Sequence, residues 1–163
     1  VSGLALGIDS IAHRATLAVN KPTIAVLVDL KKISPSTNQS LSHEILADDG
    51  LLVAENPPGT KAIPAFFAKR DRIQAGLSAA VFAIETSIDG GTMHAVRASN
   101  AMGRPVYAPD SIAAGYPDLA IDAISGTQHL IANEEAYAYT RESYPHIKAR
   151  LDEVCGSFQR AMV

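Results

Sequence analysis

The sequence has 163 residues, a formal net charge of −3 and one cysteine, Cys155. This length suits one domain with a sizeable core, and a lone cysteine excludes an internal disulfide or a multi-cysteine metal site. The apolar runs are too short to cross a bilayer and no signal peptide is visible, so we expect a cytoplasmic protein without membrane contact. The negative charge excludes nucleic-acid binding by bulk charge, so such a role would need a local basic cluster.

Strands and helices alternate along the first 110 residues. Short apolar runs predict strands at 22–30, 51–55, 79–85 and 104–109, and helical spacing predicts helices at 36–50, 63–78 and 92–103. We expect Ser36 or Thr37, and then Thr92, to cap two of these helices, and Gly50 and Gly103 to end two. Such alternation is typical of βαβ units with a mostly parallel sheet.

The pattern is weaker after residue 110, where short helical pieces are expected. An amphipathic helix follows at 141–163. Its apolar face consists of Ile147, Leu151, Val154, Phe158 and Met162. Packing on its own domain and binding to a partner both account for such a face. We therefore expect a domain over residues 1–140 followed by this helix.

The first candidate site is the segment S-G-L-A-L-G-I-D at 2–9. Val1 is expected to end a strand, and the next helix should bury an apolar face made of Ile8, Ile11, Ala12, Ala15 and Val19. Ser2, Gly3 and Gly7 lie in the turn between them. Glycines let backbone amides approach an anion, and a helix N-terminus favours a phosphate. A tight turn without a ligand explains the spacing equally well.

A second candidate is the basic cluster Lys69, Arg70 and Arg72, which stands beside two phenylalanines. Arginine binds phosphate bidentately and aromatic rings stack on bases, although a solvated helix face has the same composition. Lys32 follows the predicted strand at 22–30. Ligands of open parallel sheets bind beyond the carboxyl ends of the strands, so Lys32 is a further candidate phosphate contact.

A third candidate is the D-G-G-T turn that follows the strand at 79–85. Gly90 and Gly91 precede Thr92, which should begin a helix. This strand, glycine turn and helix repeat the arrangement at residues 2–9. The sequence thus indicates a second anion site on the same edge of the sheet.

Motifs of catalysis and cofactor binding are missing. We find no G-x-S-x-G elbow, no G-x-x-x-x-G-K-[ST] loop and no complete G-x-G-x-x-G. The five histidines lack the spacing of a metal site, and Glu85 at a strand end has no visible catalytic partner. We expect no catalytic residue, no metal and no cofactor.

Taken together, several stretches carry a family resemblance. The runs S-G-x-A-x-G-I-D at 2–9, R-x-R-I-x-x-G-L-S at 70–78, G-G-T at 90–92, G-R-P-V-Y-A at 103–108 and G-T-Q-H-L-I at 126–131 occur in this order. The chain thereby resembles the bacterial DNA-processing protein family DprA/Smf over roughly residues 1–136. The resemblance implies a Rossmann-like three-layer α/β domain with a mostly parallel sheet.

The same resemblance implies a non-enzymatic protein that binds single-stranded DNA as a homodimer, acts in natural transformation and helps to load a RecA-type recombinase. The residues that match the family's DNA-contacting segments are Ser2, Gly3, Gly7, Lys32, Lys69, Arg70, Arg72, Gly90, Gly91 and Thr92. The family also has an earlier strand–helix–strand unit with a phosphate turn. We expect this chain to start just after that unit.

The chain departs from the family at several positions near the expected site. Leu6 stands where relatives often have arginine, Ser34 replaces an aromatic residue, Asp71 replaces the asparagine between the arginines, and Asp110 replaces a glycine. These changes subtract positive charge or add negative charge. These changes favour one rival hypothesis, an interaction module that has lost its ligand site. A second rival, a nucleotide enzyme of the phosphoribohydrolase type, stays open because such Rossmann-like enzymes resemble this domain.

Overall fold

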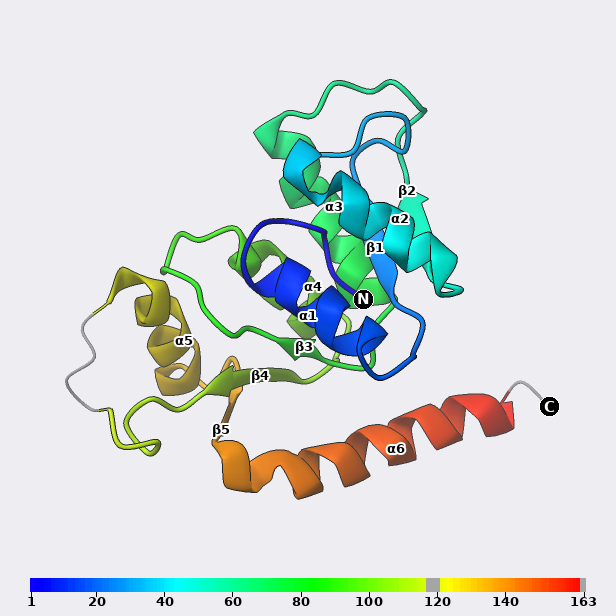
Figure 1. The fold of residues 1–163 in the computed structure, drawn as a ribbon. Helices are drawn as coiled ribbons and strands as arrows, with labels where there is room; N and C mark the ends of the chain where they lie inside the picture. The colour runs from blue at the N-terminus through cyan, green and yellow to red at the C-terminus, as the bar shows by residue number, and fades with distance from the viewer. Residues whose placement is uncertain (117–120, 162–163) are drawn as a thin grey trace. The chain divides into compact units, whose positions relative to one another are not determined.

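The computed structural model describes the backbone of residues 1–116 and 121–161, and the side chains of those residues up to 156 (Figure 1). The chain forms two compact units, residues 1–77 and 78–163. Both are built from parallel strands and helices, which confirms the predicted α/β fold class. No helix in the described part of the chain is long and apolar enough to cross a membrane.

The first unit is a parallel strand pair with helices on both faces. Its elements are α1 (Ile8–Leu17), β1 (Ile24–Leu27), the short 3₁₀ helix η1 (Ser36–Asn38), α2 (Gln39–Ala47), β2 (Leu51–Ala54) and α3 (Pro64–Gly76). β1 and β2 pair in register from Ile24 opposite Leu51. Ser2 forms a parallel bridge with Ala25 on the other side of β1, so the chain opens at a strand position, as predicted.

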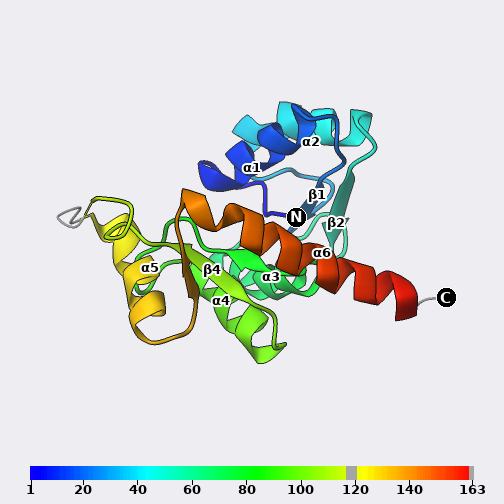
Figure 2. The ribbon, with the colours of Figure 1, turned by 90° about the horizontal axis from the view of Figure 1, so that it is seen from below.

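The core of the first unit lies between the strand pair and α2. Ala25 and Leu27 of β1 pack against Leu41 and Ile45 of α2 and against Leu4 of the opening turn. Figure 2 shows α1 and α2 on one side of the strand pair and α3 on the other. α3 begins with a proline. The first amide of a helix has no partner within the helix, so proline, which lacks an N–H, fits this position without losing a hydrogen bond.

The prediction of the apolar face of α1 is wrong. Ile11 and Val19 are 61% and 63% exposed, whereas His13 is completely buried. The cause is Asp9, whose carboxylate points back to the opening turn. Residues four apart share one face of a helix, so tying Asp9 inward also turns His13 inward and leaves Ile11 outside.

The expected caps also differ from those observed. Ser36 and Thr37 lie in η1, α2 begins after Asn38, and neither side chain caps it. Thr92 is the first helical residue of α4 and Gly91 occupies the cap position. In each case the turn before the helix is closed by backbone hydrogen bonds, such as Met93 N–H to the carbonyl of Gly90.

The second unit is a three-stranded parallel sheet with helices on both faces. Its elements are β3 (Val81–Phe82), α4 (Thr92–Ala101), β4 (Val106–Pro109), α5 (Asp122–Ala132), β5 (Tyr137–Tyr139), the 3₁₀ turn η2 (Arg141–Ser143) and α6 (Tyr144–Ala161). The strand order is β3-β4-β5. Gly103, at φ +66°, follows α4 as predicted.

Side chains of β4 alternate between two cores. Val106 and Ala108 face α4 and α5, whereas Tyr107 packs with Tyr139, Ile147 and Leu151 on the face that α6 covers. α6 therefore packs on its own unit, which is the first of the two expected roles. The side chain of Phe158 and residue Met162, which belong to the same predicted face, lie outside the described residues.

Candidate functional site

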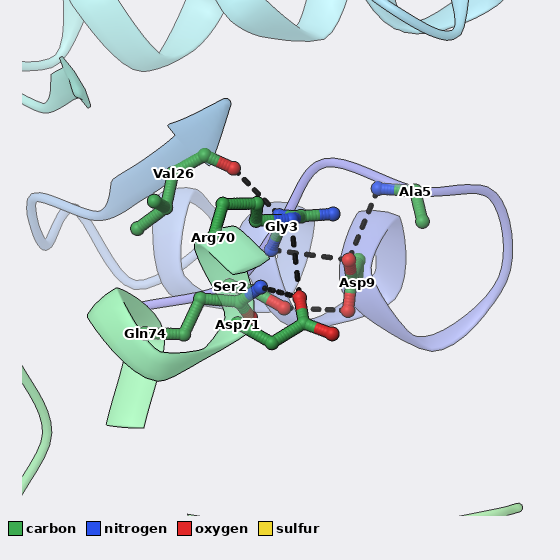
Figure 3. Close-up of polar contacts among 8 residues, drawn as sticks. All are labelled: Ser2, Gly3, Ala5, Asp9, Val26, Arg70, Asp71 and Gln74. Carbon is green, nitrogen blue, oxygen red and sulfur yellow. Dashed lines mark hydrogen bonds and ion pairs between the residues drawn. The ribbon is translucent and has the colours of Figure 1, made fainter. Parts of the chain in front are cut away.

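The opening turn folds around the carboxylate of Asp9, at the N-terminus of α1. Asp9 accepts hydrogen bonds from the Ser2 hydroxyl at 2.6 Å and from the amides of Gly3 and Ala5, both at 3.0 Å (Figure 3). These are the donors that a phosphate would use in such a turn. In the free protein this nest of donors already holds an internal anion.

Gly3 is required here for space. A β-carbon at Gly3 would lie 1.8 Å from Nη1 of Arg70, well inside contact distance. Figure 3 shows the guanidinium of Arg70 passing over this glycine from α3. The paired arginine motif and the glycine motif, nearly seventy residues apart in the sequence, therefore meet in one packed contact.

Arg70 is a buried cation, only 6% exposed. Its Nη1 donates to the carbonyl of Val26 at 2.6 Å, and its Nε lies 3.1 Å from Oδ1 of Asp71. Burial lowers the pKa of Arg70, while the negative charges of Asp71 and Asp9 oppose that shift. Because arginine stays protonated in proteins, Arg70 supplies positive charge underneath the turn and links α3 to β1.

Lys69 and Arg72, in contrast, reach the surface with side chains 55% and 50% exposed. Both form ion pairs with Glu55, which directly follows β2. Nζ of Lys69 lies 3.3 Å from Glu55 Oε2, and Arg72 donates to Oε1 of the same carboxylate. Hydrogen bonds from Arg72 and then from Lys69 lower the pKa of Glu55, which favours the ionised carboxylate.

Asp29 organises the loop that carries Lys32. Its carboxylate accepts hydrogen bonds from the amides of Gly59 at 2.8 Å, Lys31 at 2.9 Å and Lys32 at 3.2 Å. The Gly59 amide is the main cause of its lowered pKa. The side chains of Lys31 and Lys32 stay exposed on this loop.

The glycine turn of the second unit is held by α5. Thr86 N–H donates to the carbonyl of Ala123 at 2.6 Å, and Gly126 N–H donates to the carbonyl of Thr86 at 2.8 Å. A β-carbon at Gly126 would lie 2.5 Å from the carbonyl oxygen of Ser87. The loop that leads to Gly90 and Gly91 is thus fixed by a motif glycine more than thirty residues downstream.

The predicted residues therefore fall into three groups. Ser2, Gly3 and Arg70 are joined in one packed contact under the opening turn, and Lys69 and Arg72 are joined at Glu55. The third group comprises Gly7, Lys32, Gly90 and Gly91, which lie on turns and loops that follow strand positions, and Thr92, which begins α4 directly after such a turn. Sequence reasoning did not identify Asp9, Asp29 or Glu55 as residues that organise the site. Their signal was an acidic residue placed within two residues of a strand's end, or in the first turn of a helix.

Comparison of the sequence with known proteins identifies one family. The family model for DNA recombination-mediator protein A matches residues 1–148. The chain is 39% identical to protein Smf of Escherichia coli (strain K12) over 108 residues, and 36% identical to DNA processing protein DprA of Streptococcus pneumoniae over 133 residues. The chain belongs to this family, as its sequence motifs predicted.

Solved structures show the same fold. DprA from Streptococcus pneumoniae superposes with a TM-score of 0.72 at 30% identity, covering 85% of this chain and 47% of that one. DNA processing protein A from Helicobacter pylori, a protein that binds single-stranded DNA, superposes with a TM-score of 0.75 at 24% identity, covering 91% of this chain and 65% of that one. The expected Rossmann-like fold is confirmed.

The match covers only part of the relatives. The aligned region is 66% of this chain but 29% of the Escherichia coli protein, and 80% of this chain but 44% of the Streptococcus pneumoniae protein. The chain thus spans less than half the length of these curated relatives.

Proposed function

We propose that this chain binds single-stranded DNA through a surface of its first unit that carries Lys69 and Arg72. One observation carries the proposal: two exposed cations project from α3 and meet at Glu55, the residue that follows β2. The carboxyl ends of parallel strands are where such folds bind ligands. Membership of a DNA-processing family supports the same assignment.

The other predicted residues take two roles in this proposal. Ser2, Gly3 and Arg70 stabilise the opening turn through internal contacts. The Ser2 hydroxyl donates to Asp9, and the guanidinium of Arg70 fills the space beside Gly3 and donates to the carbonyl of Val26. The exposed Lys32 and the glycine turn at Gly7 supply further contacts to the DNA backbone. The glycine turn at 90–92 belongs to the second unit and is a separate candidate phosphate contact. The protein acts by binding and positioning a strand, without a catalytic step.

The test is a titration of a fluorescently labelled oligothymidylate at several salt concentrations. The double variant Lys69→Ala/Arg72→Ala should bind about tenfold more weakly near 0.1 M salt, and its slope of log K against log salt should be flatter by about 0.7 for each lost phosphate contact. Arg14→Ala is the matched control, since Arg14 is equally exposed at 55% and forms an ion pair with Glu44. Absence of binding at low salt, or equal affinity of the double variant, would contradict the proposal.

We also propose that the protein is a cytoplasmic homodimer that hands single-stranded DNA to a RecA-type recombinase during natural transformation. Family membership supports these partners. Light scattering at rising protein concentration tests the dimer, and a mass that stays at one chain would refute it.

Co-sedimentation with a RecA-type recombinase on single-stranded DNA tests the recombinase as a partner.

A further inference from the structure

Glu55 differs from the other two carboxylates near the predicted phosphate contacts. Asp9 and Asp29 each accept hydrogen bonds from several backbone amides, which would lose their partner if the carboxylate turned away. Glu55 is 39% exposed, and both of its ion-pair partners are exposed side chains. It is therefore the carboxylate of this group that can release its partners without rebuilding the backbone.

We propose that Glu55 is a built-in competitor for nucleic-acid phosphate, which occupies Lys69 and Arg72 in the free protein and yields them when DNA binds. The proposal rests on single-stranded DNA binding at these two cations. One carboxylate neutralises half of their combined charge, so the free surface presents one net positive charge where the bare cations would present two. Glu55 thus sets how tightly the surface holds a phosphate.

The exchange is energetically accessible. Exposed ion pairs are weak, because water and salt screen them and two long side chains must be ordered to form them. A phosphodiester offers the arginine fork the same pair of acceptor oxygens that a carboxylate does. Once the phosphate has entered, Glu55 lies beside a like charge and must turn to solvent. Binding therefore includes the cost of opening both ion pairs.

This competition also selects the kind of ligand. A single small anion gains one contact and must open the same two ion pairs. A strand of DNA recovers that cost through additional phosphates along its backbone, because contacts after the first one need no further dissociation. Glu55 therefore favours a polymer of phosphates over isolated anions.

The experiment compares Glu55→Gln with the wild-type protein in the oligothymidylate titration. Glutamine keeps the size of the side chain and removes its charge, so affinity should rise by about 3- to 30-fold, the range expected from two exposed ion pairs. Glu44→Gln, which removes the exposed partner of Arg14, is the matched control and should leave the affinity unchanged. The gain should vanish when Glu55→Gln is combined with Lys69→Ala/Arg72→Ala.

The possible outcomes separate the two proposals. If Lys69→Ala/Arg72→Ala weakens binding but Glu55→Gln does not tighten it, the role of Glu55 is refuted while DNA binding at these cations stands. An equal gain from Glu55→Gln in the Lys69→Ala/Arg72→Ala background would also refute it, because the effect would then be general charge. Binding by Glu55→Gln alone, with none by the wild type even at low salt, would refute DNA binding by the wild-type surface, because Glu55 would then never yield the two cations. No binding by either protein would refute DNA binding itself.

Discussion

Gly3 and Arg70 pack closely together in the first unit. The guanidinium occupies the space of a missing side chain and donates to the carbonyl of Val26. Removing a buried hydrogen-bonding partner costs more than the bond itself contributes, because the other partner is left without water. The family motif around Gly3 therefore has a structural reason besides any contact with DNA.

Gly3→Ala should destabilise the protein by about 2–3 kcal/mol, because its new methyl group overlaps the guanidinium and forces either the turn or Arg70 to move. Urea denaturation followed by circular dichroism measures the loss. Gly76→Ala is the control, since nothing lies within 4 Å of its added β-carbon, and it should be neutral or slightly stabilising. A stability equal to that of the wild type for Gly3→Ala would show that the contact is easily rearranged.

His13 is the second residue whose burial has a measurable consequence. Its ring is completely buried, and Nδ1 lies 2.8 Å from the Thr23 hydroxyl. Burial, reinforced by the positive amino group of Val1, lowers the pKa of His13 from 6.5 to about 4, against the opposing charge of Asp9. The folded protein therefore holds a neutral histidine at a pH at which the unfolded chain is already protonated.

The free energy of unfolding should consequently fall as the pH drops from about 6.5 to about 4. In this window the unfolded state binds more protons than the folded state, so stability rises with pH. A pKa lowered from 6.5 to about 4 corresponds to a loss of about 3 kcal/mol in the free energy of unfolding across this pH range. Denaturant titrations at pH 7, 5.5 and 4.5 measure the fall. His13→Gln should lack this component, and His43→Gln, at an exposed position, is the control.

At the scale of elements, α5 decides the shape of the turn after β3. Gly126 approaches the backbone of Thr86 and Ser87 so closely that no side chain fits. The turn containing Gly90 and Gly91 is therefore set by a helix that follows β4. An anion site at this turn would depend on α5 as much as on its own glycines.

Gly126→Ala should destabilise the second unit by about 1–3 kcal/mol, because its β-carbon would lie 2.5 Å from a backbone oxygen that cannot move aside cheaply. Gly156→Ala is the matched control, being another helical glycine with nothing within 4 Å of the added carbon. It should stabilise α6 by up to about 1 kcal/mol. Thermal unfolding of both variants distinguishes them, and opposite signs are expected.

Elements with a strong local pattern were predicted and others were missed. β1 is a β-branched run, and the helices before and after it show clear spacing, so their positions were predicted within a few residues. β5 is only Tyr137–Tyr139, too short for its period to be read, and it exists because Tyr107 and Pro109 of β4 pair with it. The rotation of α1 was wrong because Asp9, rather than the apolar residues, orients that helix.

At the scale of the whole molecule, the net charge of −3 opposes the approach of DNA. At physiological salt the Debye length is about 8 Å, so salt ions screen this net charge. At 0.01 M salt the Debye length is about 30 Å, and the net charge acts on DNA from farther away. Lowering the salt concentration therefore has two opposite effects on the affinity for DNA. It strengthens the attraction at Lys69 and Arg72, and it strengthens the repulsion by the rest of the surface.

The plot of log K against log salt should be linear above about 0.1 M and flatten toward 0.01 M as the net repulsion becomes effective. Extending the oligothymidylate titration to low salt tests this. The variant Asp48→Asn/Asp49→Asn removes two exposed negative charges before the amino end of β2 and should reduce the flattening. A straight line for the wild type down to 0.01 M would show that the net charge has no influence.

The sequence by itself determined the alternation of strands and helices, the parallel α/β class and the family, because hydrophobic period and glycine spacing are local properties of the chain. Only the tertiary structure decided what the polar residues do. Asp29 meets the amide of Gly59 thirty residues away, and Arg70 meets the carbonyl of Val26 across forty-four. Whether a charged side chain binds an internal partner or faces a ligand depends on which distant segments fold beside it, and no local pattern records that.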